Sequence, residues 1–478
     1  MSRRRFRLVV CALALAAAAG LVSCAGRIPT RLRVELLPVP GYPLASLRIL
    51  ITVGSANDPP GQEGLCRLAW SLLVEGGSRT ADAGEVAARL FPFGEKIGLS
   101  VDKELSVFSG TVRAADLDAY YSVFRDCLLD PGFREEDFQR AKSRQLAFLE
   151  RSLPGGADDP LADEVLNLML YGGHPYGHPS QGVVASVKAL TLGDVEAFYR
   201  KYFVQGNIIF GLGGDFRQEL MSQALADFER LPQGSTPAPV LPPARRPEGI
   251  EVGIAEKATS TDSIRLGFPV EITKTDKDYF PLWIAAASLT EDVPPFDRLV
   301  REDGSLAPGS RIADAAIEHA AWVARPFPRP NHGRRQQHFS IRLAVPESGG
   351  GARAAGRILG AIRKLVDEGI PEERLERTRA RLQSEVRLYA RTLQDHLAWR
   401  MDSKLAGNLD FLDEVQYALP RVGRDDVNGA VRKYFSAVDI CLAVVTGEAK
   451  AFASEIGASA VRTAPASEFF RVSGWPGR

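Results

Sequence analysis

Residues 194–215 read DVEAFYRKYFVQGNIIFGLGGD, and residues 426–448 read DVNGAVRKYFSAVDICLAVVTGE. Both contain an Asp-Val pair, an Arg-Lys-Tyr-Phe run, an apolar strand-like segment and a closing glycine followed by an acid. The Arg-Lys-Tyr-Phe runs begin at Arg200 and Arg432. Upstream, an acidic pair followed by basic residues begins at Glu135 and again at Glu372, with a similar separation. Matches that keep their order and similar separations indicate an internal duplication, so we expect two homologous halves.

A proline-rich stretch, PQGSTPAPVLPPARRPE, separates the halves at residues 232–248. Proline fixes the backbone angle φ and removes an N–H donor, so this composition is typical of an extended linker. We therefore predict an N-terminal domain over residues 33–231 and a C-terminal domain over residues 249–460. Residues 461–478 are predicted to form a tail.

Within each half, the spacing of apolar residues changes between strand-like and helix-like patterns. Strands are predicted over residues 47–53, 105–112, 207–212, 264–269, 339–345 and 440–445. Helices are predicted over residues 63–75, 116–129, 135–153, 191–202, 279–289, 352–367 and 372–405. This order of elements indicates an α+β fold, in which an antiparallel sheet of each half packs against helices.

The composition is that of a large globular chain without a charge bias. The 478 residues are 45% hydrophobic, and 59 basic residues balance 59 acidic ones. This length and apolar content are sufficient for more than one domain core. Since no excess of positive charge is present, we expect no nucleic-acid partner.

Residues 1–23 resemble a secretory signal peptide. A basic start is followed by an apolar run of about 15 residues, shorter than the roughly 20 that span a bilayer. Residues 21–24, Leu-Val-Ser-Cys, resemble the bacterial lipobox, in which the cysteine is acylated and becomes the mature N-terminus. We expect a signal peptide over residues 1–23, lipid attachment at Cys24 and a tether over residues 24–32. Ala25 follows the cysteine where an aspartate would favour retention in the inner membrane, so the outer membrane is favoured. The predicted location is therefore the periplasm, with the protein anchored to the outer membrane by its N-terminal lipid. A plain signal peptide with an incidental cysteine is the alternative.

Three further segments carry a family resemblance. Residues 53–65, VGSANDPPGQEGL, resemble the run before the zinc helix of M16 peptidases, the insulinase and pitrilysin group. Residues 171–177, YGGHPYG, resemble that family's FGxHPYG segment, and residues 190–215 resemble its LTxxDLxxFYxxYYxPxNxxLxVxGD segment. The resemblance covers residues 33–450 and includes the duplicated half. It implies two modules of the LuxS/MPP-like metallohydrolase type, which in this family form clam-like shells.

The zinc helix of that family carries HxxEH, in which two histidines bind Zn²⁺ and the glutamate acts as general base, while a distant glutamate completes the site. The resemblance places Arg67 at the first histidine, Trp70 at the general base, Ser71 at the second histidine and Phe148 at the distant glutamate. An arginine would repel a dication, and Glu150 is rotated by about 200° from the third position. We therefore expect no zinc, no other cofactor and no catalytic residue in this chain.

Histidine and cysteine elsewhere offer no clear replacement site. His174 and His178 are four residues apart, but the prolines and glycine around them prevent the helix that would align them, so an ordered loop is favoured over a metal site. Cys66, Cys127 and Cys441 lie in apolar sequence without a CxxC pair, which favours buried free thiols. One disulfide among these three cysteines is the open alternative.

A candidate substrate contact lies in the second half. M16 peptidases carry there a pattern like RExxGLxY, whose arginine and tyrosine bind the substrate backbone. Residues 301–308, REDGSLAP, align with it, so Arg301 matches the arginine and Pro308 stands at the tyrosine. Arg301 is thus a candidate peptide-binding residue, and a solvated charge is the alternative.

The M16 family includes non-catalytic members that partner an active subunit. The resemblance therefore predicts a catalytically inactive lipoprotein that forms a heterodimer with an HxxEH-bearing M16 chain, as part of an envelope zinc peptidase acting on peptides. One alternative is a stand-alone peptide-binding or scaffold lipoprotein of the outer membrane, with residues 99–101 or 105–112 as the peptide-binding edge strand. Another is an active metallopeptidase with an unrecognised site.

Overall fold

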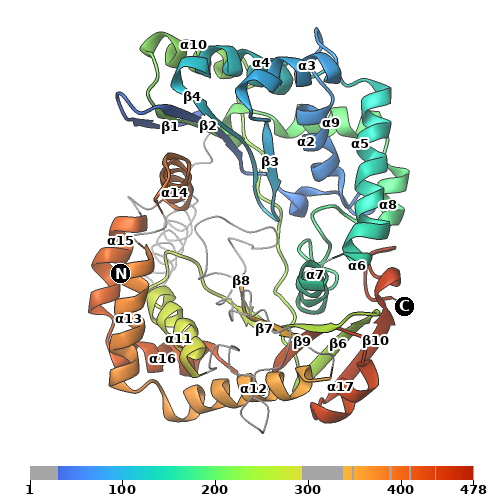
Figure 1. The fold of residues 1–478 in the computed structure, drawn as a ribbon, viewed down its shortest axis with the longest axis vertical. Coiled ribbons are helices and arrows are strands. Elements are labelled where there is room, and N and C mark those ends of the chain that lie inside the picture. Colours follow the sequence, from blue (N-terminus) through green and yellow to red (C-terminus); the bar gives the residue numbers. More distant parts are fainter. Residues whose placement is uncertain are drawn as a thin grey trace, which may run out of the picture.

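A computed structural model describes residues 31–156, 158–292, 337–346, 349–386, 390–407, 411–436 and 438–476. The predicted signal peptide, Cys24 and Arg301 lie outside the described residues. Two sheets form the framework, one from each half of the chain, with helices packed around them (Figure 1).

The first sheet has the strand order β1-β5-β2-β4-β3. Its strands are β1 (Arg33–Pro38), β2 (Leu44–Ile51), β3 (Gly98–Val101), β4 (Ser106–Arg113) and β5 (Ile208–Gly214). In β2, every residue after the first is buried, which shows that both faces of the sheet are covered. The strand after the first Arg-Lys-Tyr-Phe run, β5, therefore lies inside the sheet and not at its edge.

The second sheet has the strand order β10-β6-β9-β7-β8. Its strands are β6 (Ile250–Glu256), β7 (Thr261–Val270), β8 (Gln337–Pro346), β9 (Ile440–Thr446) and β10 (Ala460–Pro465). The run β6-β9-β7-β8 repeats β1-β5-β2-β4 with the same strand directions. This repeat confirms the duplication predicted from the two Arg-Lys-Tyr-Phe runs.

The two-module α+β fold is as predicted, but the sheets are not antiparallel throughout. In each module the late strand inserts between the first two strands, so that β1 pairs in parallel with β5 and β6 pairs in parallel with β9. Both sheets are consequently mixed. The connection between a parallel pair needs a long crossover, and the helices of each module provide it.

The described helices of the first module are α2 (Leu65–Glu75), α3 (Ala83–Leu90), α4 (Leu117–Leu129), α5 (Glu135–Ala147), α6 (Leu153–Gly155), α7 (Asp158–Leu170), α8 (Val184–Ala189), α9 (Leu192–Tyr202) and α10 (Gln218–Glu229). Those of the second are α11 (Tyr279–Asp292), α12 (Gly351–Glu368), α13 (Glu372–Val386), α14 (Leu393–Ala406), α15 (Phe411–Ala418), α16 (Arg424–Tyr434) and α17 (Ala449–Glu455). No helix among the described residues is both long and apolar enough to cross a membrane.

Two predicted helices are shorter than expected. The helix predicted over residues 135–153 changes to a π-helical turn, Phe148–Ser152, at the end of α5. The helix predicted over residues 372–405 is two helices, because α14 has its own start: the Thr392 hydroxyl accepts a hydrogen bond from the Asp395 N–H at 3.1 Å. A capped start of this kind separates α14 from α13 and lets it pack elsewhere.

Each module covers part of the other module's sheet. Helix α14, from the second half, packs on β5, β2 and β1, and helix α7, from the first half, packs on β9, β7 and β6 (Figure 1). The buried side chains of Leu397 and Met401 in α14 form one apolar cluster with Leu50 and Ile209 of the first sheet. Each module therefore contributes a helix to the core that covers the other module's sheet.

The predicted C-terminal tail, residues 461–478, is not a tail at its start. Strand β10 pairs in parallel with β6 from Ala460 to Pro465. Phe469 and Phe470 are then buried in an apolar cluster between the modules. The linker predicted over residues 232–248 contains no helix or strand.

Candidate functional site

Helix α2 corresponds to the zinc helix of the family resemblance, and the carboxylate of the half-buried Asp58 defines its start. The two carboxylate oxygens of Asp58 accept hydrogen bonds from the N–H groups of Gly64 and Cys66, each at 2.7 Å. Burial raises the pKa of Asp58 to about 8, although these two hydrogen bonds act in the opposite direction. Gly64 has a φ of +103°, which permits the sharp entry into the helix.

The positions of the first three zinc-site residues on α2 have different environments. Arg67 is half-buried and lines a cavity. Trp70 is fully buried, and its ring makes edge-to-face contacts with Phe108, Phe198 and Phe203 at centroid distances of 5.4 to 6.0 Å. Ser71 is also buried, with 8% of its surface exposed. Of these three residues, only Arg67 therefore lines the cavity.

The fourth position, Phe148, packs as an ordinary apolar residue. It is half-buried and contacts the apolar cluster between the modules. Gln145, one turn earlier, donates hydrogen bonds to the carbonyls of Gly64 at 3.0 Å and Gln181 at 2.7 Å, which ties this helix to the start of α2. Glu150 is exposed and forms an ion pair with Lys188 at 2.8 Å.

These residues do not fit a zinc ion. A guanidinium, an indole, a hydroxyl and a phenyl ring provide none of the imidazole and carboxylate ligands that the family's metal uses. Within the described part of the chain, no group of three or more His, Cys, Asp or Glu side chains could hold a metal ion.

His174, in the 171–177 segment, and His178, directly after it, lie in buried turns without a helix. The Nδ1 atom of His174 accepts a hydrogen bond from the Tyr176 N–H at 2.9 Å. Since a carbonyl can only accept, the Nδ1–H of His178 donates to the carbonyl of Pro179 at 2.9 Å. These turns confirm that the prolines prevent a helical His174–His178 pair.

A buried ionic cluster beside these turns was missed in the sequence. Lys103 is fully buried; its ammonium group donates to the carbonyl of His178 and lies 3.9 Å from Glu164 of α7. Burial and, next, the charge of Lys103 lower the pKa of His178 to about 4. The available signal was the charged run of residues 102–104 between two apolar strands.

The cavity that Arg67 lines has a volume of about 1050 Å³ and lies among α2, α3, α5 and β3. Its other arginines are occupied: Arg144 pairs with Glu75 at 2.8 Å, Arg140 pairs with Asp137, and Arg134 donates to the carbonyls of Gly76 and Ser78 at 3.3 and 2.9 Å. Among the described side chains, none forms an ion pair or hydrogen bond with the Arg67 guanidinium.

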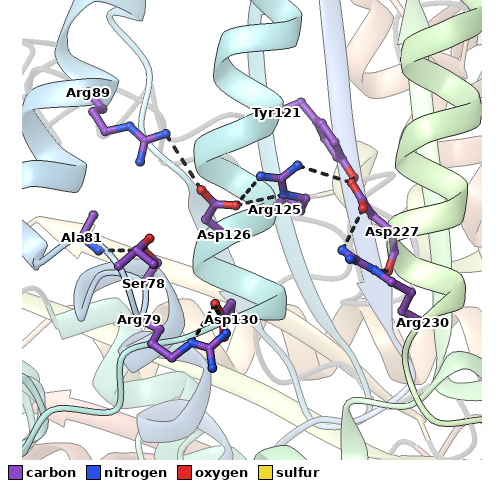
Figure 2. Close-up of polar contacts among 11 residues, drawn as sticks. Ser78, Arg79, Ala81, Arg89, Tyr121, Arg125, Asp126, Asp130, Asp227 and Arg230 are labelled. Atoms are coloured by element: carbon purple, nitrogen blue, oxygen red, sulfur yellow. Dashed lines mark hydrogen bonds and ion pairs between the residues drawn. The ribbon is translucent and has the colours of Figure 1, made fainter.

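A polar network around α4 connects it to α3, which lines this cavity, and to α10 (Figure 2). Asp126 of α4 pairs with Arg89 of α3 at 3.9 Å and with its neighbour Arg125 at 2.6 Å. Arg125 in turn reaches Asp227 of α10 at 3.6 Å, and the Tyr121 hydroxyl donates to the same carboxylate at 2.9 Å. The network therefore links α3, α4 and α10 into one layer.

One of the two predicted edge strands lies at an edge. Strand β3, which contains residues 99–101, pairs with β4 and ends the sheet. Strand β4, which contains residues 106–112, lies between β2 and β3 and has no free edge. Leu99 of β3 lines the same cavity as Arg67.

The three cysteines within the described residues are buried free thiols, as the sequence favoured. Burial raises the pKa of each thiol, to about 12 for Cys127 and Cys441. Such thiols are poor nucleophiles, because the thiolate is the reactive form.

Two family models match the chain. Residues 33–152 match the model described as Insulinase (Peptidase family M16), and residues 189–382 match the model described as Peptidase M16 inactive domain. The second match begins within the first module and continues into the second, and the two matches together cover nearly two thirds of the 478 residues.

Curated relatives are more distant. An uncharacterized zinc protease of Streptomyces coelicolor is 26% identical over 271 residues, which are 55% of this chain and 58% of the relative. Mitochondrial-processing peptidase subunit beta of Blastocladiella emersonii is 22% identical over 303 residues, 61% of this chain and 60% of the relative. The chain thus matches about three fifths of the length of these two relatives.

Solved structures share the whole fold. A peptidase M16 inactive domain from Pseudomonas fluorescens has a TM-score of 0.70 at 18% identity and covers 87% of this chain and 95% of its own. A protease from Helicobacter pylori has a TM-score of 0.69 at 16% identity, with 87% and 97% of the two chains covered. With both family models and the duplicated sheet order in agreement, the chain belongs to the M16 peptidase family, the insulinase family.

Proposed function

We propose that this chain is a catalytically inactive M16 protein and the partner subunit of a zinc peptidase that acts on peptides. The observation that carries this proposal is that α2 keeps an ordered, packed structure although residues unsuited to zinc stand at its metal positions. The helix keeps its capped start and its packing, while the positions for metal and general base hold Arg67, Trp70 and Ser71. The fold is thus maintained without the groups that zinc hydrolysis requires.

The comparisons support a partner role. One matching family model is described as an inactive domain, and one curated relative is named as the beta subunit of a processing peptidase. A chain that keeps the shell but lacks the metal site can complete the substrate chamber of a catalytic subunit.

We further propose that the protein is anchored to the outer membrane by lipid on Cys24 and faces the periplasm. The lipobox-like residues 21–24 support this location. A structural neighbour with a TM-score of 0.66 at 14% identity is described as the first half of a periplasmic protease from Escherichia coli.

The direct test is purification of the tagged full chain from detergent-solubilised membranes of its own host. We expect an M16 chain with an intact HxxEH to co-purify at about one to one, since closed pairs are the commonest assembly. Chelator should abolish peptide hydrolysis by the pair, and the separated chain should contain no zinc. A Cys24→Ala variant should leave the membrane fraction. A chain that consistently purifies alone would contradict the partner role.

A stand-alone peptide-binding role is favoured by one specific observation, the edge strand β3 beside the cavity. Peptide affinity of the isolated chain, without any M16 partner in the host, would support it. Stoichiometric zinc in the isolated chain, together with chelator-sensitive hydrolysis, would instead establish an active peptidase with a different site.

A further inference from the structure

The cavity among α2, α3, α5 and β3 contains a cation that the fold leaves unpaired. The Arg67 side chain is half-buried there, and among the described residues no acid lies within ion-pairing distance of it. Three other arginines of the same cavity are all engaged by acids or carbonyls. Lys96 also lines the cavity, but it is exposed to solvent, so Arg67 is the half-buried cation whose partner would come from outside the chain.

Arg67 cannot avoid the cost of a half-buried, unpaired charge by losing its proton. Its guanidinium remains charged in proteins, and removing a charge from water without a partner is unfavourable. Glu75, the acid of the cavity with the largest effect on Arg67, is already paired with Arg144 at 2.8 Å. Of the remaining acids of the cavity, Glu136 is exposed to solvent, Asp137 pairs with Arg140, and Asp82 accepts a hydrogen bond from the Glu85 N–H at the start of α3. Glu95 forms no ion pair with Arg67 among the described residues, and burial raises the pKa of Glu95.

The rest of the cavity suits a peptide. Its volume of about 1050 Å³ is at the upper end of ordinary ligand sites. Val86, Leu90 and Leu99 give it an apolar side, and Phe91 at its border is 85% exposed. The edge strand β3 offers backbone groups to an extended chain, so that alternate side chains of an added strand would point into the cavity.

We propose that Arg67 binds a carboxylate of a captured peptide, so that this cavity selects peptides with an acidic side chain or a free C-terminus. Arginine is suited to this role because its planar fork can donate two parallel hydrogen bonds to one carboxylate. The position that holds a metal ligand in the family resemblance is here an anion-binding position. The inference rests on the peptide-binding part of the proposed function and is independent of the partner role.

The test uses the purified full chain and fluorescein-labelled decapeptides of alternating valine and threonine with one variable central residue. The reference peptide has glutamine at the centre and an amidated C-terminus. A second peptide has a central glutamate, and a third has a free C-terminus. Fluorescence anisotropy should show at least one carboxylate peptide binding about tenfold or more tightly than the reference, as expected for a charge-assisted contact. The tighter of the two identifies the source of the carboxylate.

Variants assign the preference to one side chain. Arg67→Gln should bind all three peptides with equal affinity, and Arg67→Lys should retain part of the preference. The matched control is Arg140→Gln, which removes a cation of the same cavity that is already paired with Asp137 and should keep the full preference. Equal binding of the three peptides by the unaltered chain, no binding of any of them, or a preference that survives Arg67→Gln would overturn the proposal.

The partner role is measured separately with the same Arg67→Gln variant. Co-purification of the HxxEH-bearing chain should persist in this variant, because Arg67 lies inside the cavity. A retained partner without a carboxylate preference in the unaltered chain would contradict this inference and leave the proposed function standing. A clear carboxylate preference in a chain that co-purifies with no M16 partner would support this inference and contradict the proposed partner role.

Discussion

Arg67 and Trp70 stand three positions apart on α2 and have opposite environments. Three positions turn a side chain by about 300° around the helix, so the two side chains emerge only about 60° apart, where the cavity side of α2 meets its core side. Trp70 accordingly lies among three aromatic rings, while Arg67 faces the cavity. The resemblance of residues 53–65 to the run before the zinc helix predicted the positions of both residues on α2. Their different environments depend on which distant segments pack against each side of this helix.

Trp70→Ala should destabilise the protein by about 3–5 kcal/mol, because it removes a fully buried indole and leaves a cavity. Urea denaturation at neutral pH measures this change. Arg67→Gln is the control on the same helix, and it should change the free energy of unfolding by less than about 1 kcal/mol. Equal effects of the two substitutions would show that Trp70 is not a core residue.

The stability of the protein should depend on His178 below neutral pH. Its pKa is lowered from 6.5 to about 4 in the folded chain, by burial and then by Lys103. The unfolded chain therefore binds a proton that the folded chain does not, and stability decreases as the pH falls from about 6.5 towards 4. His178→Gln should reduce the loss of unfolding free energy between pH 7 and pH 5 by about 2 kcal/mol.

Urea denaturation at the two pH values gives this difference for the unaltered chain and the variant. His396→Gln, which removes a histidine at a half-buried position on α14, is the matched control variant. An unchanged pH dependence in His178→Gln would mean that the imidazole is already protonated in the folded chain or accessible to solvent.

The presence of most helices and strands was easier to predict from the sequence than the residues at which they begin and end. The apolar spacing of α2, α4 and α9 gave their ranges to within two residues, because an amphipathic helix shows its period locally. The break between α13 and α14 was missed, since residues 372–405 are polar enough to continue one helix and only the Thr392 cap marks a new start. Strand β10 was missed for a different reason: it is short and exposed, so its sequence has little apolar alternation.

Gly64 should be essential for the start of α2. A Cβ atom there would lie 2.6 Å from the carbonyl oxygen of Gln181, in addition to the strain of a positive φ. Gly64→Ala should therefore destabilise the protein by more than about 2 kcal/mol in urea denaturation. Gly61→Ala is a close control, since Gly61 also has a positive φ but no atom within 4 Å of its Cβ position, and its effect should be about 1 kcal/mol. Equal effects would exclude the predicted clash.

At the scale of the whole molecule, the modules are interdependent. Helix α7 covers strands of the second sheet, and helix α14 covers strands of the first (Figure 1). Glu35 of β1 adds polar contacts across the same boundary, since its carboxylate pairs with Arg400 at 2.6 Å and Lys404 at 3.1 Å. Neither sheet would be fully covered by helices from its own half.

Leu397→Ala tests this interdependence. Leu397 belongs to α14 but packs against Leu50 and Ile209 of the first sheet, so its loss should destabilise the protein by about 2–5 kcal/mol. Hydrogen exchange should become faster in β2 and β5, although both strands are distant from Leu397 in the sequence. Leu375→Ala is the control, because Leu375 is equally buried within the second module's own core and should leave β2 and β5 protected. Exchange that changes only around α14 would contradict the shared core.

Local patterns in the chain were sufficient to predict the duplication, the α+β class and the M16 resemblance, since motif spacing and apolar periodicity are properties of neighbouring residues. The absence of the zinc residues stays a prediction from the same resemblance. The tertiary structure decided which surfaces meet. It placed α14 on the first sheet and α7 on the second, inserted the late strand of each module between the first two, and left Arg67 unpaired in a cavity among the described residues. An amphipathic pattern shows that a face is buried, but the partner of that face is determined only when distant segments pack together.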